Sequence, residues 1–207
     1  MKVSHVLYKV NNLENSFSNF KKKGFNIEYG SKRNPHNAII YFSEGPYIEL
    51  LEKAPISSFA KTLLKIIGKR KVVDRFHIWE NANEGFFEIC LENHTTNFIE
   101  EEAIFKRFGL DYFITKSKRL DPLERLLKWK LLFPNNLQIP FLMTPFNINP
   151  KPKNYIHPNG IIRIKHILYT INSEFIPILN RLCNDSILSV SIGKGGVKEV
   201  FYEKKKK

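Results

Sequence analysis

The sequence predicts an α+β fold built from repeated strand and helix units. One heptapeptide occurs twice, as HVLYKVN at residues 5–11 and as HILYTIN at residues 166–172. Short β-branched stretches alternate with segments whose apolar residues recur every three or four positions, the spacing of an amphipathic helix. The order strand, helix, three strands occurs twice along the chain. We therefore predict two βαβββ modules followed by a third, shorter βαββ unit.

Residues 1–53 form the first predicted module. An apolar, β-branched strand leads into an Asn-Asn turn, and Leu13, Phe17 and Phe20 then mark the apolar face of a helix. Consecutive lysines and Gly24 end this helix, since cations and a left-handed glycine both favour a helix C-terminus. Three strands complete the module, at residues 25–29, 37–42 and 46–52.

Residues 54–85 interrupt this order, and residues 86–146 resume it. The interruption contains an amphipathic helix at 57–67, followed by a basic, polar connection. The second module then consists of a strand, a helix that ends at Gly109, and three further strands. These elements are expected at residues 86–92, 96–108, 112–115, 126–133 and 140–146.

The last part of the chain supplies the third unit. Prolines make residues 147–160 an extended linker, because proline lacks the amide donor that a central strand needs. Residues 161–203 then form a βαββ segment that opens with the second heptapeptide, and residues 204–207 form a basic tail. Duplication with divergence explains the repeat. Chance similarity is the alternative, because β-branched strands draw on few residue types.

The composition is strongly basic, with 33 Lys and Arg residues against 20 Asp and Glu and a net charge of +13. Such a charge attracts nucleic acid and anionic lipid. However, the cations lie in separate clusters at residues 21–23, 69–71 and 204–207, not in one stripe interleaved with aromatic side chains. We therefore do not expect nucleic acid as a partner, and a basic nucleic-acid-contacting protein is only the third hypothesis.

The sequence also gives expectations about compartment and cysteine chemistry. No run approaches the roughly 18 apolar residues of a membrane span, and the first ten residues lack the pattern of a secretory signal. Cys90 and Cys183 each lie in an apolar stretch, as buried thiols do. We expect a cytoplasmic protein with no membrane partner, no disulfide framework and no thiolate zinc site.

Seven stretches carry a family resemblance. They are SHVLYKVNNLENSFSNFKKKGFNIEYG, PHNAIIYF and PYIELLE in the first module, EGFFEICLEN, KWKLLFP and IPFLMTPF in the second, and HPNG at residues 157–160. Together they resemble a glyoxalase-like domain of the vicinal oxygen chelate superfamily, over nearly the whole chain. The resemblance implies that the βαβββ modules form an open, curled mixed β-sheet around a central cavity.

The resemblance also implies candidate metal ligands, because metal-dependent members use a His on the first strand and a Glu on the fourth strand of each module. His5 and Glu49 match these positions in the first module, and such a pair suits one divalent ion, Fe, Mn, Zn or Ni. In the second module, alignment places Glu88 near the position of His5 and Met143 near that of Glu49. A thioether is a poor ligand for such an ion. The third unit could complete the set if His166 faces the same cavity, with Glu199 as the carboxylate, but we expect His166 to be a structural echo of His5.

Asn37 and Trp129 are further candidates for the cavity wall, beside Met143. Asn37 would lie at the rim, where its amide could orient a ligand oxygen or cap the turn after Pro35. Trp129 alternates with two lysines along a strand, so either the tryptophan or the lysines face the cavity. The tryptophan would provide a stacking wall and the lysines would provide anion contacts.

Two functions fit these residues. The first is a divalent-metal-dependent lyase, isomerase or dioxygenase-type enzyme, in which His5 and Glu49 hold the ion and Glu88 acts as a base. The alternative is a metal-free module of the same fold that binds and sequesters a small molecule, and Met143 favours it. The sequence leaves open whether the chain is an enzyme. A homodimer is the assembly suggested by analogy with similar modules.

Overall fold

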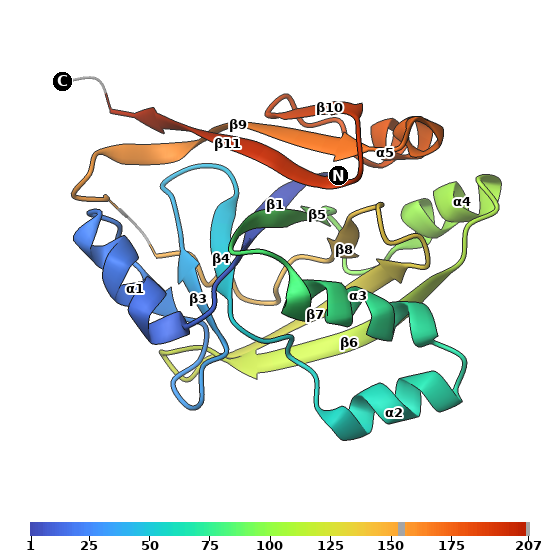
Figure 1. Ribbon diagram of the computed structural model, residues 1–207, viewed down its shortest axis with the longest axis horizontal. Helices are drawn as coiled ribbons and strands as arrows, with labels where there is room; N and C mark the ends of the chain where they lie inside the picture. The colour runs from blue at the N-terminus through green and yellow to red at the C-terminus, as the bar shows by residue number, and fades with distance from the viewer. Residues whose placement is uncertain (153–155, 206–207) are drawn as a thin grey trace.

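The computed structural model describes residues 1–152 and 156–205 and consists of a large curled sheet with a small sheet stacked on one side (Figure 1). The large sheet has the strand order β2-β3-β4-β1-β5-β8-β7-β6. Its first module comprises β1 (Lys2–Lys9), α1 (Leu13–Lys22), β2 (Glu28–Tyr29), β3 (Asn37–Ile40) and β4 (Tyr47–Leu51). Its second module comprises β5 (Gly85–Glu92), α4 (Ile99–Arg107), β6 (Tyr112–Leu120), β7 (Leu126–Pro134) and β8 (Phe141–Met143). The predicted α+β class and open, curled mixed sheet are confirmed.

The two modules join at the centre of the large sheet through β1 and β5. β1 pairs in parallel with β4 and antiparallel with β5, while β5 pairs in parallel with β8. Each first strand therefore lies between the last strand of its own module and the first strand of the other. Alternate side chains point to opposite faces of the large sheet. Val6 therefore lies in the hydrophobic core on the outer face, which the third unit covers, and Leu7 lies in the core on the inner face, which α3 covers.

Local sequence signals explain the bounds of α1. The Asn12 side chain accepts a hydrogen bond from the backbone amide of Asn15 at 2.8 Å, which caps the first turn. Two lysines lie in the last turn, and Gly24 follows at φ 78°, the left-handed conformation that favours glycine. The backbone amide of Asn159, in the HPNG motif, donates to the Gly24 carbonyl at 3.1 Å. This motif thus fastens the linker to the end of α1.

β6 is longer than the predicted strand, which ended at Thr115. It continues to Leu120 because every residue from Tyr112 onward pairs with β7 in an unbroken antiparallel register. Its exposure alternates: Lys116 and Lys118 are exposed, while Thr115, Ser117 and Arg119 are partly buried. The polar stretch after Thr115 is therefore a strand with one face toward the interior.

Two helices, α2 (Ser58–Ile66) and α3 (Arg70–Asn81), lie between the modules. α2 matches the predicted helix to within one residue at each end, and Ser57 caps it by accepting from the Ala60 amide at 3.2 Å. The predicted polar connection after α2 is wrong. α3 buries Val72, Phe76 and Trp79 at helical spacing, a periodicity that the neighbouring cations obscured.

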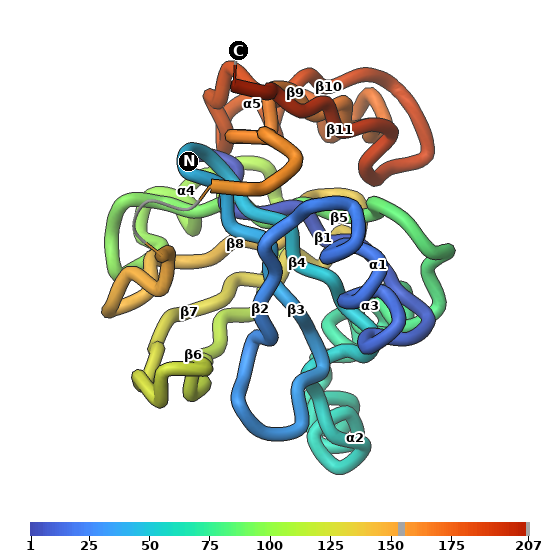
Figure 2. The backbone as a smooth tube through the Cα atoms, turned by 90° about the vertical axis from the view of Figure 1, so that its left-hand side faces the viewer, coloured from blue at the N-terminus to red at the C-terminus, as the bar shows by residue number. Residues whose placement is uncertain are grey.

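The third unit forms a separate three-stranded sheet that covers the outer face of the large one (Figures 1 and 2). It comprises β9 (Ile161–Ile171), a 3-10 turn (Ser173–Phe175), α5 (Ile176–Leu182), β10 (Leu188–Ile192) and β11 (Gly196–Lys204). Ile167 belongs to the same apolar core as Val6. Residues 153–155 of the predicted linker and the last two residues of the predicted basic tail lie outside the described residues.

The two heptapeptides occupy similar strands in differently connected sheets. β1 and β9 each lie between one parallel and one antiparallel neighbour. However, the parallel neighbour of β9 is β10, the next strand of its unit, whereas that of β1 is β4, the last. The third unit therefore has the predicted βαββ order without being a shortened copy of the βαβββ topology.

The cysteines and the lengths of the helices can also be compared with the predictions. Cys90 and Cys183 are buried free thiols, as predicted. Within the described ranges, no helix has the length and apolar character needed to cross a bilayer.

Candidate functional site

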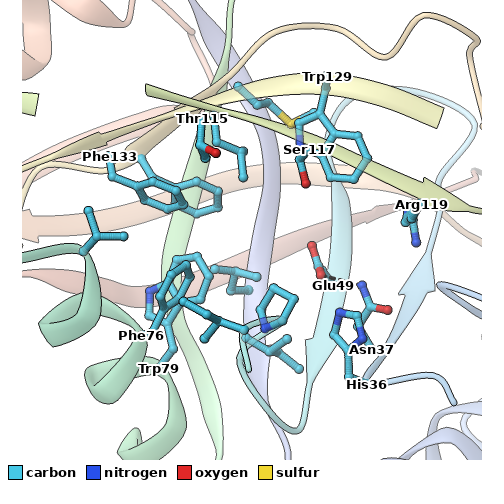
Figure 3. A pocket seen from close by; sticks show the side chains of 18 of the residues that line it. His36, Asn37, Glu49, Phe76, Trp79, Thr115, Ser117, Arg119, Trp129 and Phe133 are labelled. Atoms are coloured by element: carbon cyan, nitrogen blue, oxygen red, sulfur yellow. Dashed lines mark hydrogen bonds between the residues drawn. The ribbon is translucent and has the colours of Figure 1, made fainter. Parts of the chain in front are cut away.

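The inner face of the large sheet, together with α2 and α3, encloses a cavity of about 530 Å³. This volume falls within the range of small-molecule sites, roughly 300–1,000 Å³. Polar side chains gather on one side of the cavity and aromatic ones on the other, as Figure 3 shows for His36, Asn37, Glu49 and Arg119 opposite Phe76, Trp79 and Phe133. The cavity therefore suits a ligand with an apolar body and one polar end.

His5 and Glu49 form the centre of the polar end. The parallel register of β1 and β4 places Glu49 beside Leu7, two residues from His5 along the strand and on the same face of the sheet, so that His5 Nε2 lies 3.4 Å from Glu49 Oε2. Asn37 Nδ2 donates to Glu49 Oε1 at 2.6 Å, and the His5 ring stacks on Tyr47 with centroids 4.6 Å apart. Neighbouring groups thus hold both candidate ligand side chains in place.

Burial controls the charge of the imidazoles here. Burial lowers the pKa of His5 from 6.5 to about 4, Glu49 opposes this shift, and Arg119 adds to it. Burial likewise lowers the pKa of His36. His5 is therefore neutral at neutral pH. Among the described residues, its buried Nδ1 has no hydrogen-bond partner.

Arg119 of β6 is a cavity residue that the sequence did not suggest. Its Nη1 donates to the Gly30 carbonyl, and its guanidinium lies 5.9 Å from the centroid of the Phe146 ring. A side chain at Gly30 would overlap Asn37 Oδ1 and place its Cβ 2.6 Å from Arg119 Nη1, so this close approach requires glycine. The alternation of Thr115, Ser117 and Arg119 with exposed lysines was the signal that could have identified this wall.

Trp129 and six further phenylalanine or tryptophan side chains line the apolar part of the cavity. Trp129 contacts Phe146 edge to face, with ring centroids 4.9 Å apart. On the other side, Trp79 of α3 lies 4.9 Å from Phe141, which stacks on Phe133. The sequence left open whether Trp129 or the lysines on either side of it face the cavity. The structure shows that Trp129 of β7 faces it. The aromatic rings supply a rigid surface for a flat or apolar ligand.

The second module places sulfur atoms where the first has His5 and Glu49. His5 pairs with Tyr47 on the last strand of its module, and Cys90 pairs with Phe141 on the last strand of the other, so Cys90, two residues after Glu88, takes the position that corresponds to His5. Met143 matches Glu49, as aligned, because Tyr47 and Phe141 occupy equivalent positions beside His5 and Cys90. Ser4 Oγ donates to the Met143 sulfur at 3.3 Å.

This set of donors does not fit a divalent ion held by four ligands. Burial raises the pKa of Cys90 well above its ordinary value, so the thiol stays protonated, and thioethers bind hard ions poorly. In the described part of the chain, no group of three or more His, Cys, Asp or Glu side chains is arranged to hold a metal ion. Among the residues that the structure describes, His5 and Glu49 form a pair without two further ligands.

Glu88, the candidate base, lies outside the residues that line the cavity. Its Oε2 accepts a hydrogen bond from Arg75 Nη1 of α3 at 2.8 Å, and the Tyr169 hydroxyl of β9 lies 3.3 Å from its Oε1. Arg75 also donates to the Asn136 and Ile139 carbonyls at 2.9 and 2.8 Å. Glu88 thus connects α3, the large sheet and the third unit. Because it does not line the cavity, we do not propose it as a catalytic base.

His166 does not reach the cavity. It lies on β9 of the small sheet, pairs with Phe201 of β11, and its ring centroid is 6.2 Å from that of Phe201. Asn37, Trp129 and Met143 do line the cavity, together with His5 and Glu49. The structure thus brings five of the predicted site residues to one cavity and leaves Glu88 and His166 elsewhere.

The fold and cavity define a class of proteins in which two βαβββ modules curl around one small-molecule site. A family model described as a glyoxalase-like domain matches residues 3–174. The chain therefore belongs to the glyoxalase-like domain family. No curated protein sequence matches it.

Two solved structures share this fold. A hypothetical protein from Staphylococcus aureus is similar with a TM-score of 0.62 and 16% identity, over 95% of this chain and 88% of that one. The Mn(II)-bound glyoxalase from Novosphingobium aromaticivorans is similar with a TM-score of 0.55 and 10% identity, over 97% of this chain. This chain spans only 64% of that glyoxalase. At these identities the similarity is one of fold.

Proposed function

We propose that this protein binds a small molecule in its cavity without a metal ion. The observation that carries this proposal is the pair of sulfur atoms, in Cys90 and Met143, at the positions that correspond to His5 and Glu49. The ligand would have an aromatic or apolar body that packs against Trp129, Phe133 and their neighbours. Sequestration of such a molecule needs no further chemistry.

The polar end of the cavity would orient the ligand. The Glu49 carboxylate accepts hydrogen bonds, the Arg119 guanidinium donates them, and the Ser117 hydroxyl can do both. Glu49 and Arg119 carry opposite charges, while His5 is neutral at neutral pH. The polar group of the ligand would therefore combine a donor with an acceptor and carry little net charge.

Filling the cavity should abolish binding. Thr115 lines the cavity from β6, so Thr115→Trp would place an indole in the space of the ligand. We expect it to weaken binding of the neutral fluorescent probe N-phenyl-1-naphthylamine by at least about tenfold, the loss of roughly 1.4 kcal/mol, measured by titration in buffer containing EDTA. Lys128→Trp, on the exposed side of β7, adds the same side chain outside the cavity and should leave binding unchanged. Equal binding by both variants would place the probe elsewhere.

Metal analysis tests the other part of the proposal. The alternative, a metal-dependent lyase, isomerase or dioxygenase-type enzyme, is favoured by one observation, the 3.4 Å approach of His5 Nε2 to Glu49 Oε2. We expect protein purified without chelator to hold far less than one Fe, Mn, Zn or Ni ion per chain by mass spectrometry, because two ligands are too few for tight binding. Stoichiometric metal that disappears in His5→Ala and in Glu49→Gln would overturn the metal-free proposal in favour of the enzyme.

A further inference from the structure

Helix α2 exposes an apolar stripe to solvent. Phe59, Leu63, Ile66 and Ile67 are 80%, 49%, 76% and 52% exposed, and their spacing places them on one side of the helix. Ala60 and Leu64, which border the stripe around the helix, line the cavity. In both views α2 lies at the end of the molecule opposite the small sheet (Figures 1 and 2). The stripe, defined as Phe59, Leu63, Ile66 and Ile67, is therefore accessible.

The segment that carries this stripe is rich in cations. Residues 53–73 contain no Asp or Glu and carry six cations, Lys53, Lys61, Lys65, Lys69, Arg70 and Lys71. Lys61 pairs with Glu80 of α3 at 2.7 Å, and Lys69 lies over the Phe113 ring. Lys65 and Lys71 are exposed. An exposed apolar stripe beside unbalanced positive charge is the pattern of a helix that binds in the interface of an anionic bilayer.

We propose that α2 docks on an anionic phospholipid bilayer, with the stripe in the interface and the lysines against lipid headgroups. A second copy of this chain would meet the same cations across a symmetric contact, and like charges would repel. Nucleic acid would use the cations but leave the aliphatic side chains without a partner. The absence of a spanning segment led us to expect no membrane partner, but surface docking needs no such segment.

Docking would place the wall of the cavity next to the bilayer. Leu63 belongs to the stripe and also lines the cavity, while Ala60 and Leu64 face inward from the same helix. Apolar molecules concentrate in bilayers, so a cavity whose wall lies on the lipid surface has a nearby source of ligand. The docking proposal goes beyond the proposed ligand binding and does not depend on it, because vesicle binding is measured without any cavity ligand.

Vesicle flotation of the full chain tests this proposal. We expect binding to vesicles of equimolar phosphatidylcholine and phosphatidylglycerol to exceed binding to phosphatidylcholine alone by at least about tenfold, and to weaken as salt is raised. The double variant Phe59→Ser/Ile66→Ser should bind at least about tenfold less well, because it loses two apolar side chains from the interface. Leu123→Ser, which alters a residue 73% exposed between β6 and β7, should bind like the wild type.

A second pair of variants tests the charge. Lys65→Glu/Lys71→Glu should reduce binding to the anionic vesicles, while Lys204→Glu/Lys205→Glu, with the same change in net charge at the C-terminal end, should change it little. The proposal is overturned if the wild type binds neither vesicle, or if the stripe variant binds as the wild type does. A concentration-dependent dimer that Phe59→Ser/Ile66→Ser dissociates, without vesicle binding, would make a second copy the partner. A shift of labelled DNA without vesicle binding would likewise overturn it.

Discussion

Arg75→Met is expected to lower the free energy of unfolding by about 3–5 kcal/mol, the usual cost of removing one partner from a buried ion pair. Arg75 is 1% exposed, and its guanidinium satisfies the Glu88 carboxylate and two carbonyls at once. Burial already raises the pKa of Glu88, and Arg75 opposes that shift. Without Arg75, Glu88 would be buried with no cation beside it. Denaturant unfolding measures the loss, which is a large part of the stability of an ordinary domain.

Two controls test whether the loss of stability in Arg75→Met comes from breaking a buried ion pair or only from removing a positive charge. Arg163 pairs with Glu203 on the surface, with its side chain 44% exposed, so Arg163→Met should lower the free energy of unfolding far less than Arg75→Met does. The double variant Arg75→Met/Glu88→Leu should recover much of the stability, because it removes the isolated carboxylate as well. If Arg75→Met were as mild as Arg163→Met, the network joining α3 to the large sheet and β9 would have no energetic role.

The stability of the protein should fall in acid because of His5. Its pKa is about 4 in the folded state and 6.5 in the unfolded state, so the unfolded state takes up a proton first as the pH falls. The free energy of unfolding should decrease between pH 6.5 and 4 by about 3 kcal/mol from this residue, and no further below pH 4. Above pH 6.5 the imidazole is neutral in both states and contributes no pH dependence.

His5→Gln provides the comparison. Burial also lowers the pKa of His36 and of His157, so other residues contribute in the same direction, and only the difference between wild type and variant reports on His5. Denaturant unfolding of both proteins at several pH values should show a shallower loss for His5→Gln. Parallel curves for the two proteins would mean that His5 is not desolvated as the structure indicates.

Much of the local structure could be predicted from the sequence, because periodicity and turn residues act over a few positions. The bounds of α2 were predicted to within one residue, and α1 contains Leu13, Phe17 and Phe20, whose spacing predicted it. α3 was missed because cations near its start suggested a connection, while its apolar residues are buried only against the inner face of the large sheet. β6 was predicted too short because its polar residues extend the strand only by pairing with β7.

In the candidate site, too, some residues could be predicted from the sequence and others depend on contacts between distant segments. The resemblance to a known module was enough to suggest His5 and Glu49, and the structure places both in the cavity. Cys90 could not be identified as the partner of His5, since that depends on a register between strands whose sequences are far apart. Arg119 reaches the polar end only because the curl of the sheet carries β6 opposite β3 and β4.

The sequence by itself determined the order of the modules, the position of the repeated strands and the basic character of residues 53–73, because these depend on composition and short-range periodicity. Only the tertiary structure decided which side chains are buried, which line the cavity and which are exposed. It buried Glu88 against Arg75, kept His166 away from the cavity, and left the apolar side of α2 in solvent. Strand register, sheet curvature and helix docking arise from contacts between distant segments, and no local pattern encodes them.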